Sequence, residues 1–312
     1  MAKTLVYLRK LKRFGLRLVV RAKWITLPFF DGVPLYDVSL FFWKSITKGA
    51  ISTRASGIAF SFFLALFPTI IFLFTLIPYL QIQNFQNDLF LIIKEIVPDS
   101  IFTEIQGTID DIINNPRGGL LSLGFFMALY FSTNGFAAMM AAFDASIHSR
   151  TSRTWLKQRL ISFLLLIILS ILLLATIALL TGGQWLIDYL LNNHILEDRF
   201  TYYILTIGRW IIIIALFFFA YSFLYYMAPA KKTRWRFISA GGTMATTLSI
   251  MIFVGFGFYI NNFSQYNKLY GSIGTLLIVL LLIYLLSFVL LLGFELNASI
   301  REAKVNNKRL RV

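Results

Sequence analysis

Six stretches of the sequence are each long and apolar enough to cross a lipid bilayer as a helix. A transmembrane helix needs about 20 predominantly apolar residues. Because hydrocarbon offers no hydrogen-bond partner to the backbone, each stretch is expected to be helical. The six stretches are residues 57–80, 119–142, 160–180, 203–227, 237–260 and 272–298. The sequence therefore predicts an all-α polytopic membrane protein with six transmembrane helices.

The composition excludes the main alternatives to a membrane protein. Hydrophobic residues make up 58% of the chain and charged residues 14%, whereas soluble domains average about 45–50% and about 25%. A chain this apolar is neither a soluble enzyme domain nor a disordered chain. The chain also contains no cysteine, so it has no ligands for a cysteine zinc site or an iron–sulfur cluster.

Residues suited to catalysis are scarce. The two histidines, His148 and His194, fall in segments expected on opposite faces of the membrane. No metalloprotease, nucleophile-elbow or nucleotide-binding motif stands in a suitable context. We therefore expect a protein that is not an enzyme and that uses neither a metal nor a cofactor.

Lysine and arginine gather in alternate segments between the six stretches. Of the 29 such residues, 24 lie before the first stretch, after the second, after the fourth and after the sixth. The remaining segments hold Lys94, Arg117, Arg199, Arg209 and Lys268. Because cytoplasmic segments are enriched in Lys and Arg, both chain termini are expected in the cytoplasm.

Three regions follow from charge and hydropathy. Residues 1–54 are expected to form a basic region at the cytoplasmic surface, with an amphipathic helix over 1–24 suited to anionic headgroups and a linker over 27–36. Residues 55–300 form the transmembrane domain, and its external segment, about 81–118, has the spacing of two short helices broken at Pro98. Residues 301–312 form a basic cytoplasmic tail.

Polar residues at membrane depth are the candidate functional residues, because each is costly there unless it is paired or hydrated. Glu295 is either a pathway carboxylate or the partner of a cation such as Arg54; a structural pair near the interface is the plainer interpretation. Asn134 either lines a cavity or makes a hydrogen bond between helices. Arg209 either extends toward the outer surface or meets an anionic headgroup.

A polar run on the outer side joins the fifth and sixth stretches. Tyr266, Asn267, Lys268 and Tyr270 lie in it, and their donors could hold a phosphate or a carboxylate. The plainer interpretation is a turn with two tyrosines in the interfacial aromatic belt.

Proline and glycine add two expectations about helix shape. Pro68 lies in the middle of the first stretch, where it is expected to kink the helix and either open a lateral cleft or bend it without consequence. Small residues that would allow close helix approach are Gly241, Gly242, Gly255, Gly257, Gly271 and Gly274.

Several of these residues stand in motifs that resemble the YihY / virulence factor BrkB family, once labelled ribonuclease BN-like. The motifs, in order, are residues 54–61 (RASGIAFS), residues 66–68 (LFP), Pro229, residues 234–236 (RWR), Gly241, residues 266–272 and residues 293–298 (GFELNA). The similarity covers about residues 40–300, and Phe294 stands where alanine is commoner in the family. The resemblance implies a six-helix protein of the bacterial inner membrane, and some members are linked to envelope integrity.

Two functions are expected from the residues and the resemblance together. The first is a transporter or translocator of lipid or an anionic amphiphile in the cell envelope, in which Arg54 and Glu295 form an inner gate or pair. The alternative is a non-transporting membrane scaffold or envelope assembly factor. The expected partners are anionic membrane lipids, with a homo-oligomer left open. No nucleic-acid partner is expected, because topology already accounts for the basic segments, and the chain offers no nuclease constellation.

Overall fold

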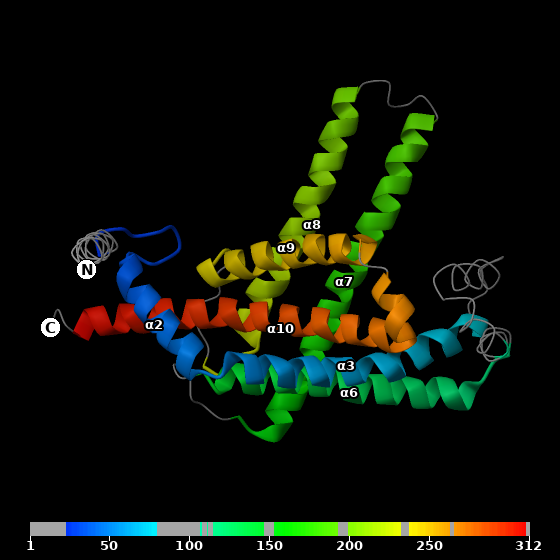
Figure 1. Ribbon diagram of the computed structural model, residues 1–312, viewed down its shortest axis with the longest axis horizontal. Coiled ribbons are helices and arrows are strands. Elements are labelled where there is room, and N and C mark those ends of the chain that lie inside the picture. Colours follow the sequence, from blue (N-terminus) through cyan, green and yellow to red (C-terminus); the bar gives the residue numbers. More distant parts are fainter. Residues whose placement is uncertain are drawn as a thin grey trace, which may run out of the picture. The chain divides into compact units, whose positions relative to one another are not determined.

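A computed structural model describes residues 23–79, 107, 111, 115–146, 153–192, 199–231, 237–262 and 265–309. Over these residues the chain forms helices joined by turns, with no strand (Figure 1). The helices are α2 (Leu35–Lys48), α3 (Ile51–Leu76), the 3-10 turn η1 (Ile77–Tyr79), α6 (Gly118–Asp144), α7 (Trp155–Asn192), α8 (Arg199–Met227), α9 (Ala240–Asn262) and α10 (Gln265–Arg309).

The expected all-α fold with six membrane-spanning helices is confirmed. Six helical segments of the described residues are long and apolar enough to cross a bilayer: Ile51–Tyr79, Gly118–Asp144, Trp155–Gly183, Tyr203–Met227, Ala240–Tyr259 and Leu276–Asn307. Large apolar side chains along these helices face outward, as Leu173 and Leu174 do on α7. Such extensive outward apolar surface suits hydrocarbon and would promote aggregation in water.

Two boundaries differ from those expected. The polar run 266–272 is helical, so the turn expected there is wrong; α10 already begins at Gln265. Since this run has no proline, none of its residues breaks a helix, and Gly271 adds a cost of only about 1 kcal/mol. At its other end, α10 continues to Arg309, although the sequence placed the end of the span at residue 298. Its final turns are basic, which favours a helix carboxyl end.

The described helices belong to two compact units. The first holds the residues up to Ile58 and from Phe136 onward. Within it, α10 packs against α9 and α2, while α8 packs against α7 and α9. A small apolar core joins α2, α9 and the end of α10; its buried members are Phe30, Val33, Val38, Ala240, Ile300 and Ala303. The helix α2 therefore anchors the region before the first span, where the sequence analysis did not foresee a separate helix.

The second unit is Ala59–Gly135, which contains most of α3 and α6. The two helices approach closely at Gly124 and Gly135: a Cβ at Gly124 would lie 3.1 Å from the Phe72 nitrogen, and one at Gly135 would lie 2.7 Å from the Phe62 ring. The helix α3 runs through Pro68 without interruption, and the kink expected there stays a prediction.

Some expectations concern residues that the structure does not describe. The amphipathic helix over 1–24 falls almost wholly on them, as does most of the external cap 81–118. Both histidines and the basic run 232–236 also lie outside the described residues.

Candidate functional site

One segment of α10, residues 293–298, contacts several neighbouring elements of the first unit. It begins at Gly293, whose backbone lies against Gly241 of α9. A Cβ at Gly293 would come within 2.6 Å of the Gly241 oxygen and 2.2 Å of the Tyr225 hydroxyl. The close helix approach expected at Gly241 is therefore present, whereas Gly255 and Gly257 have no neighbour within 4 Å of such a Cβ.

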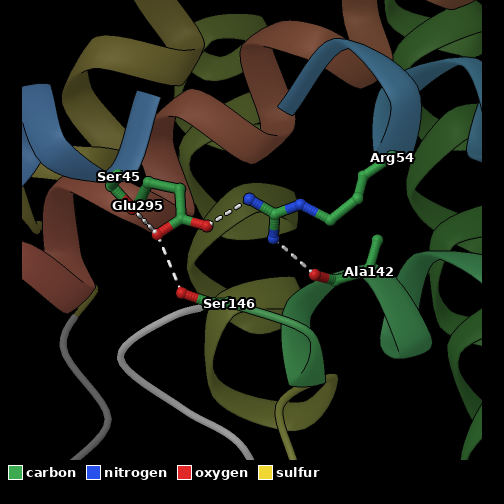
Figure 2. Close-up of polar contacts among 5 residues, drawn as sticks. All are labelled: Ser45, Arg54, Ala142, Ser146 and Glu295. Atoms are coloured by element: carbon green, nitrogen blue, oxygen red, sulfur yellow. Dashed lines mark hydrogen bonds and ion pairs between the residues drawn. The ribbon is translucent and has the colours of Figure 1, made fainter. Parts of the chain in front are cut away.

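Glu295, two residues further along α10, is the acceptor at the centre of a buried polar cluster (Figure 2). Arg54 of α3 donates from Nη2 to Oε1 at 2.6 Å. Ser146, just after α6, donates to Oε2 at 2.8 Å, and Ser45 of α2 donates to the same oxygen. The cluster thus ties α10 to α2, to the start of α3 and to the end of α6.

The Arg54–Glu295 ion pair is almost fully removed from solvent. The Glu295 side chain is 0% exposed and that of Arg54 is 10% exposed. Arg54 also donates from Nη1 to the Ala142 carbonyl at 2.7 Å (Figure 2), while its Nε has no hydrogen-bond partner among the described residues. Burial of a charge is tolerated when it is paired and its lone pairs are satisfied, and the Glu295 carboxylate meets both conditions.

A second contact fixes the end of α6 to the end of α8. An Asp144 carboxylate oxygen accepts a hydrogen bond from the Ala230 nitrogen at 2.7 Å. Arg153, which lies just before α7, is attracted by the same carboxylate. Burial lowers the pKa of the Arg153 guanidinium from its ordinary value, and the Asp144 charge partly offsets this lowering.

Asn297 holds the amino end of α9. Its Oδ1 accepts from the Gly241 nitrogen at 2.8 Å, and its Nδ2 donates to Ser239 Oγ at 3.1 Å. Ser239 Oγ in turn accepts from the Gly242 nitrogen at 3.0 Å. Two of the amide groups that a helix start leaves without internal partners are thereby satisfied.

Next to this segment lies a pocket of about 360 Å³, which we call the basic pocket. Its walls come from the loop before α2, from α8 and the turn after it, from the residue before α9, and from α10. The residues that line it are Phe29, Asp31, Ser222, Tyr225, Tyr226, Pro229, Lys231, Ser239, Phe294, Asn297, Ala298, Ile300, Arg301 and Lys304.

The lining of the basic pocket changes from buried neutral side chains at its floor to cations at its mouth. Its floor contains Ser222, Tyr225 and Phe294, all buried side chains within the fourth and sixth spans. The Tyr225 hydroxyl is occupied, since it donates to the Leu290 carbonyl at 2.9 Å. Its mouth contains the exposed Lys231 and the half-exposed Lys304. In both chain segments the neutral lining residues precede the cations: Ser222 and Tyr225 come before Lys231, and Phe294 comes before Arg301 and Lys304.

Three cations and one carboxylate line the mouth. Lys304 pairs with Asp31 at 2.9 Å. Lys231 and Arg301 have no ion-pair partner among the described residues. Glu302 follows Arg301 in the chain and attracts it, but does not line the pocket. The lining charges therefore leave a net positive mouth, which favours an anionic ligand.

The structure brings only some of the sequence-predicted site residues together. Arg54 and Glu295 form the expected pair, but neither lines the basic pocket. Asn134 is half-buried on α6 in the second unit. Arg209 is half-buried on α8, lies against Gly183 of α7 and has its guanidinium 6.0 Å from the Trp210 ring. A pathway role for these residues stays a prediction.

The outer donors form no described cluster. Tyr266, Asn267, Lys268 and Tyr270 lie in the first two turns of α10, and their side chains are outside the described part of the chain. Their role as a donor cluster also stays a prediction.

Sequence reasoning missed both serines of the cluster and the whole basic pocket. Ser45 and Ser146 carry no periodic or charge signal, because serine is common in helices and loops alike. Arg301 and Lys304 were counted as topology signals only. A usable signal was their spacing: with Asn297 and Phe294 they recur every three or four residues, which places them on one face of a helix.

Comparison of the sequence with known protein families identifies the family of this chain. The family model described as virulence factor BrkB matches residues 42–311. The chain belongs to this family. The match contains Ser45, Arg54, Ser146 and Glu295, and it contains the basic pocket apart from Phe29 and Asp31.

Relatives of the BrkB family cover most of this chain. The ribonuclease-like protein YfkH of Bacillus subtilis is 29% identical over 252 residues, which are 81% of this chain and 90% of YfkH. A UPF0761 membrane protein of Tolumonas auensis is 24% identical over 284 residues, 86% of each chain. No solved structure matches the chain. The relatives named as membrane proteins and the six apolar helices identify a multi-pass membrane protein.

Proposed function

We propose that this BrkB-family protein binds an anionic amphiphile of the bacterial inner membrane and moves it between leaflets. The observation that carries the proposal is the basic pocket, which is cationic at its mouth and neutral and partly aromatic at its floor. A lipid with an anionic headgroup has a matching arrangement: its charge lies at one end and its apolar surface follows. The pocket is therefore complementary to an amphiphile rather than to a small inorganic ion alone.

The position of the pocket along the spans supports the same proposal. Its floor lies within the Tyr203–Met227 and Leu276–Asn307 spans. Lys231 lies four residues beyond the end of the former, and Arg301 and Lys304 lie in the last two turns of the latter. A headgroup at the mouth would thus sit at the level where lipid phosphates and basic side chains meet. The distribution of Lys and Arg predicts that this is the cytoplasmic leaflet, with both termini on that side.

The Glu295 cluster is proposed to position the pocket rather than to form part of a path. Phe294 and Asn297 line the pocket on either side of Glu295, whose own carboxylate points into the cluster (Figure 2). Three donors from three other segments hold this one acceptor. They fix the rotation of α10 and with it the face that α10 presents to the pocket.

Proteoliposomes test the proposal directly. The full chain is reconstituted with fluorescent phosphatidylglycerol or phosphatidylcholine, and lipid reaching the outer leaflet is bleached by dithionite. We expect wild-type protein to move phosphatidylglycerol faster than empty vesicles do. Arg301→Gln should slow it about tenfold, because a lost charge-assisted contact is worth about 1.5–3 kcal/mol. Lys44→Gln is the matched control, since Lys44 is exposed on α2 and does not line the pocket.

Either of two results would contradict the translocation proposal. The first is a wild-type rate equal to that of empty vesicles when the protein is folded and reconstituted in both orientations. The second is equal slowing by Arg301→Gln and Lys44→Gln, which would assign the effect to surface charge in general rather than to the pocket.

A second candidate function is a non-transporting scaffold in the cell envelope. The buried cluster favours it, because the charges of Arg54 and Glu295 are satisfied internally and do not face the basic pocket. The helix α2 also exposes Leu40 and Trp43, which could contact lipid or a partner. Deletion of the external segment 81–118 discriminates between the two functions: loss of an envelope phenotype with translocation intact supports scaffolding.

We also propose that the protein acts without catalysing a reaction and without binding nucleic acid. One relative is named for a likeness to ribonuclease, and that name motivates a simple check. Purified protein should release no acid-soluble product from labelled RNA above a detergent blank, and reproducible cleavage by independent preparations would overturn this part of the proposal.

A further inference from the structure

We propose that the basic pocket selects amphiphiles whose headgroup ends in a phosphate monoester, a dianion, over those with a phosphate diester, a monoanion. This inference rests on the proposed function, since it names the chemistry of the headgroup that the same pocket would hold. It concerns binding, however, and can be tested without any measurement of translocation.

The charge at the mouth sets the preference. Lys231, Arg301 and Lys304 contribute three positive charges, and Asp31 contributes one negative charge. The described lining residues therefore carry a net charge of about +2 at neutral pH. A phosphate monoester carries about −1.5 to −2 at pH 7, whereas a diester carries a single charge. The monoester therefore matches the charge of the lining residues more closely than the diester does.

The contacts at the mouth show which cations are available. Asp31 already holds Lys304 at 2.9 Å, while Lys231 and Arg301 lack an ion-pair partner in the described part of the chain. A dianion can contact both Lys231 and Arg301 and leave the Asp31–Lys304 pair intact. The planar guanidinium of Arg301 can also donate two parallel hydrogen bonds to one phosphate. A diester offers one charge and two unesterified oxygens, so one cation would stay unneutralised.

Asp31 acts in this arrangement as an internal competitor for the ligand. Its carboxylate pairs with Lys304, the third cation of the mouth. Without this carboxylate, Lys304 would be able to bind any anion. Asp31 has a backbone φ of 56°, in the left-handed region that asparagine adopts more readily than most residues. Asp31→Asn therefore removes the charge without straining the loop.

The remaining walls accommodate the rest of the amphiphile. Phe29 lies at the mouth, half exposed, and Ile300 and Phe294 are buried along the α10 wall. This apolar surface distinguishes a lipid from a free phosphate ion, which would gain nothing from it.

Native mass spectrometry of the full chain in detergent provides the test. Equal amounts of dioleoyl phosphatidic acid, a monoester, and dioleoyl phosphatidylglycerol, a diester, compete for the protein at pH 8. We expect about tenfold more phosphatidic acid bound, because one further charge beside an unpaired cation is worth about 1.4 kcal/mol. Displacement by inorganic phosphate would support recognition of the phosphate alone. Displacement only by short-chain phosphatidic acid would support recognition of the lipid.

Three variants connect the preference to the pocket. Arg301→Gln and Lys231→Gln should each lower the ratio of bound phosphatidic acid to bound phosphatidylglycerol, by at most about tenfold, while each variant still binds some lipid. Lys231 is exposed enough that its variant should fold. Asp31→Asn should raise phosphatidylglycerol binding and narrow the ratio, whereas a merely structural Asp31 would lower binding of both lipids. Lys44→Gln should leave the ratio unchanged.

Equal binding of the two lipids by wild-type protein would overturn the inference, as would a preference that survives both Arg301→Gln and Lys231→Gln. The outcome is separable from that of the proposed function. A monoester preference without translocation would leave a lipid-binding scaffold, and translocation without a preference would leave a translocator whose headgroup selectivity lies elsewhere.

Discussion

Removal of the Glu295 carboxylate should be among the most destabilising single changes in the first unit. The side chain is 0% exposed and accepts from Arg54, Ser146 and Ser45. Glu295→Ala leaves the Arg54 guanidinium, itself 10% exposed, as a buried charge beside the Ala142 carbonyl. Breaking a buried pair by removing one partner costs about 3–5 kcal/mol. We expect a loss of about that size in the free energy of unfolding.

The three groups that donate to Glu295 should respond differently to each substitution, so the variants should differ in how much stability they lose. In Glu295→Gln the two serine hydroxyls can rotate and accept from the new amide, but the Arg54 guanidinium can only donate. The loss should therefore be smaller than for Glu295→Ala, yet still above about 1 kcal/mol, the usual cost of one neutral hydrogen bond. Removing both partners in Arg54→Met with Glu295→Leu should cost less than the sum of the single changes, because no charge is left unpaired.

The assay is an equilibrium unfolding titration with sodium dodecyl sulfate in mixed micelles, analysed as a double-mutant cycle. The coupling between Arg54 and Glu295 should fall at about 2–3 kcal/mol, the upper part of the range for contacting residues. A loss below about 0.5 kcal/mol for Glu295→Ala, typical of surface changes, or strictly additive single losses would refute the reasoning.

Further changes test neighbouring contacts by the same titration. Asp31→Asn should lower the free energy of unfolding by less than about 1 kcal/mol, because the Lys304 side chain is 43% exposed and that of Asp31 is 19% exposed. A loss as large as that of Glu295→Ala would contradict the burial argument. Gly293→Ala should cost about 1–3 kcal/mol from overpacking, since its Cβ would lie 2.2 Å from the Tyr225 hydroxyl. Gly255→Ala, the matched control in open space, should be neutral or stabilise by about 0.5–1 kcal/mol. Asn297→Leu should cost about 1–2 kcal/mol by uncapping α9, and an unchanged midpoint would show that Ser239 suffices as the cap.

The transmembrane helices could be predicted from the sequence because one physical requirement dominates them. A segment in hydrocarbon must be apolar and must satisfy its own backbone, so the start of α6 at Gly118 and the end of α8 at Met227 fall within a residue of the sequence boundaries. The end of α10 did not, because hydropathy stops at the last apolar residue whereas the helix continues to Arg309. A helix that leaves the membrane needs no apolar surface on its far side.

The candidate site could be predicted only where charge and depth coincide. Glu295 near the end of an apolar stretch is costly unless it is paired or hydrated, so a pair with a cation such as Arg54 is one of the interpretations that the sequence allows. The roles of Ser45 and Ser146 could not be predicted, because nothing in a serine requires one hydrogen-bond partner rather than another. The basic pocket is created by packing between α8, α10 and the loop at Asp31, and the sequence gives no distance between those three segments.

Photochemical labelling tests occupancy of the basic pocket most directly. A phosphatidic acid analogue with a diazirine near the glycerol end of its acyl chain is irradiated with the full chain in vesicles, and the labelled peptides are mapped by mass spectrometry. The account predicts labels on Phe294 and Tyr225 at the pocket floor, and their loss in Arg301→Gln but not in Lys44→Gln. Labels confined to outward-facing residues such as Leu173, unchanged by Arg301→Gln, would contradict it.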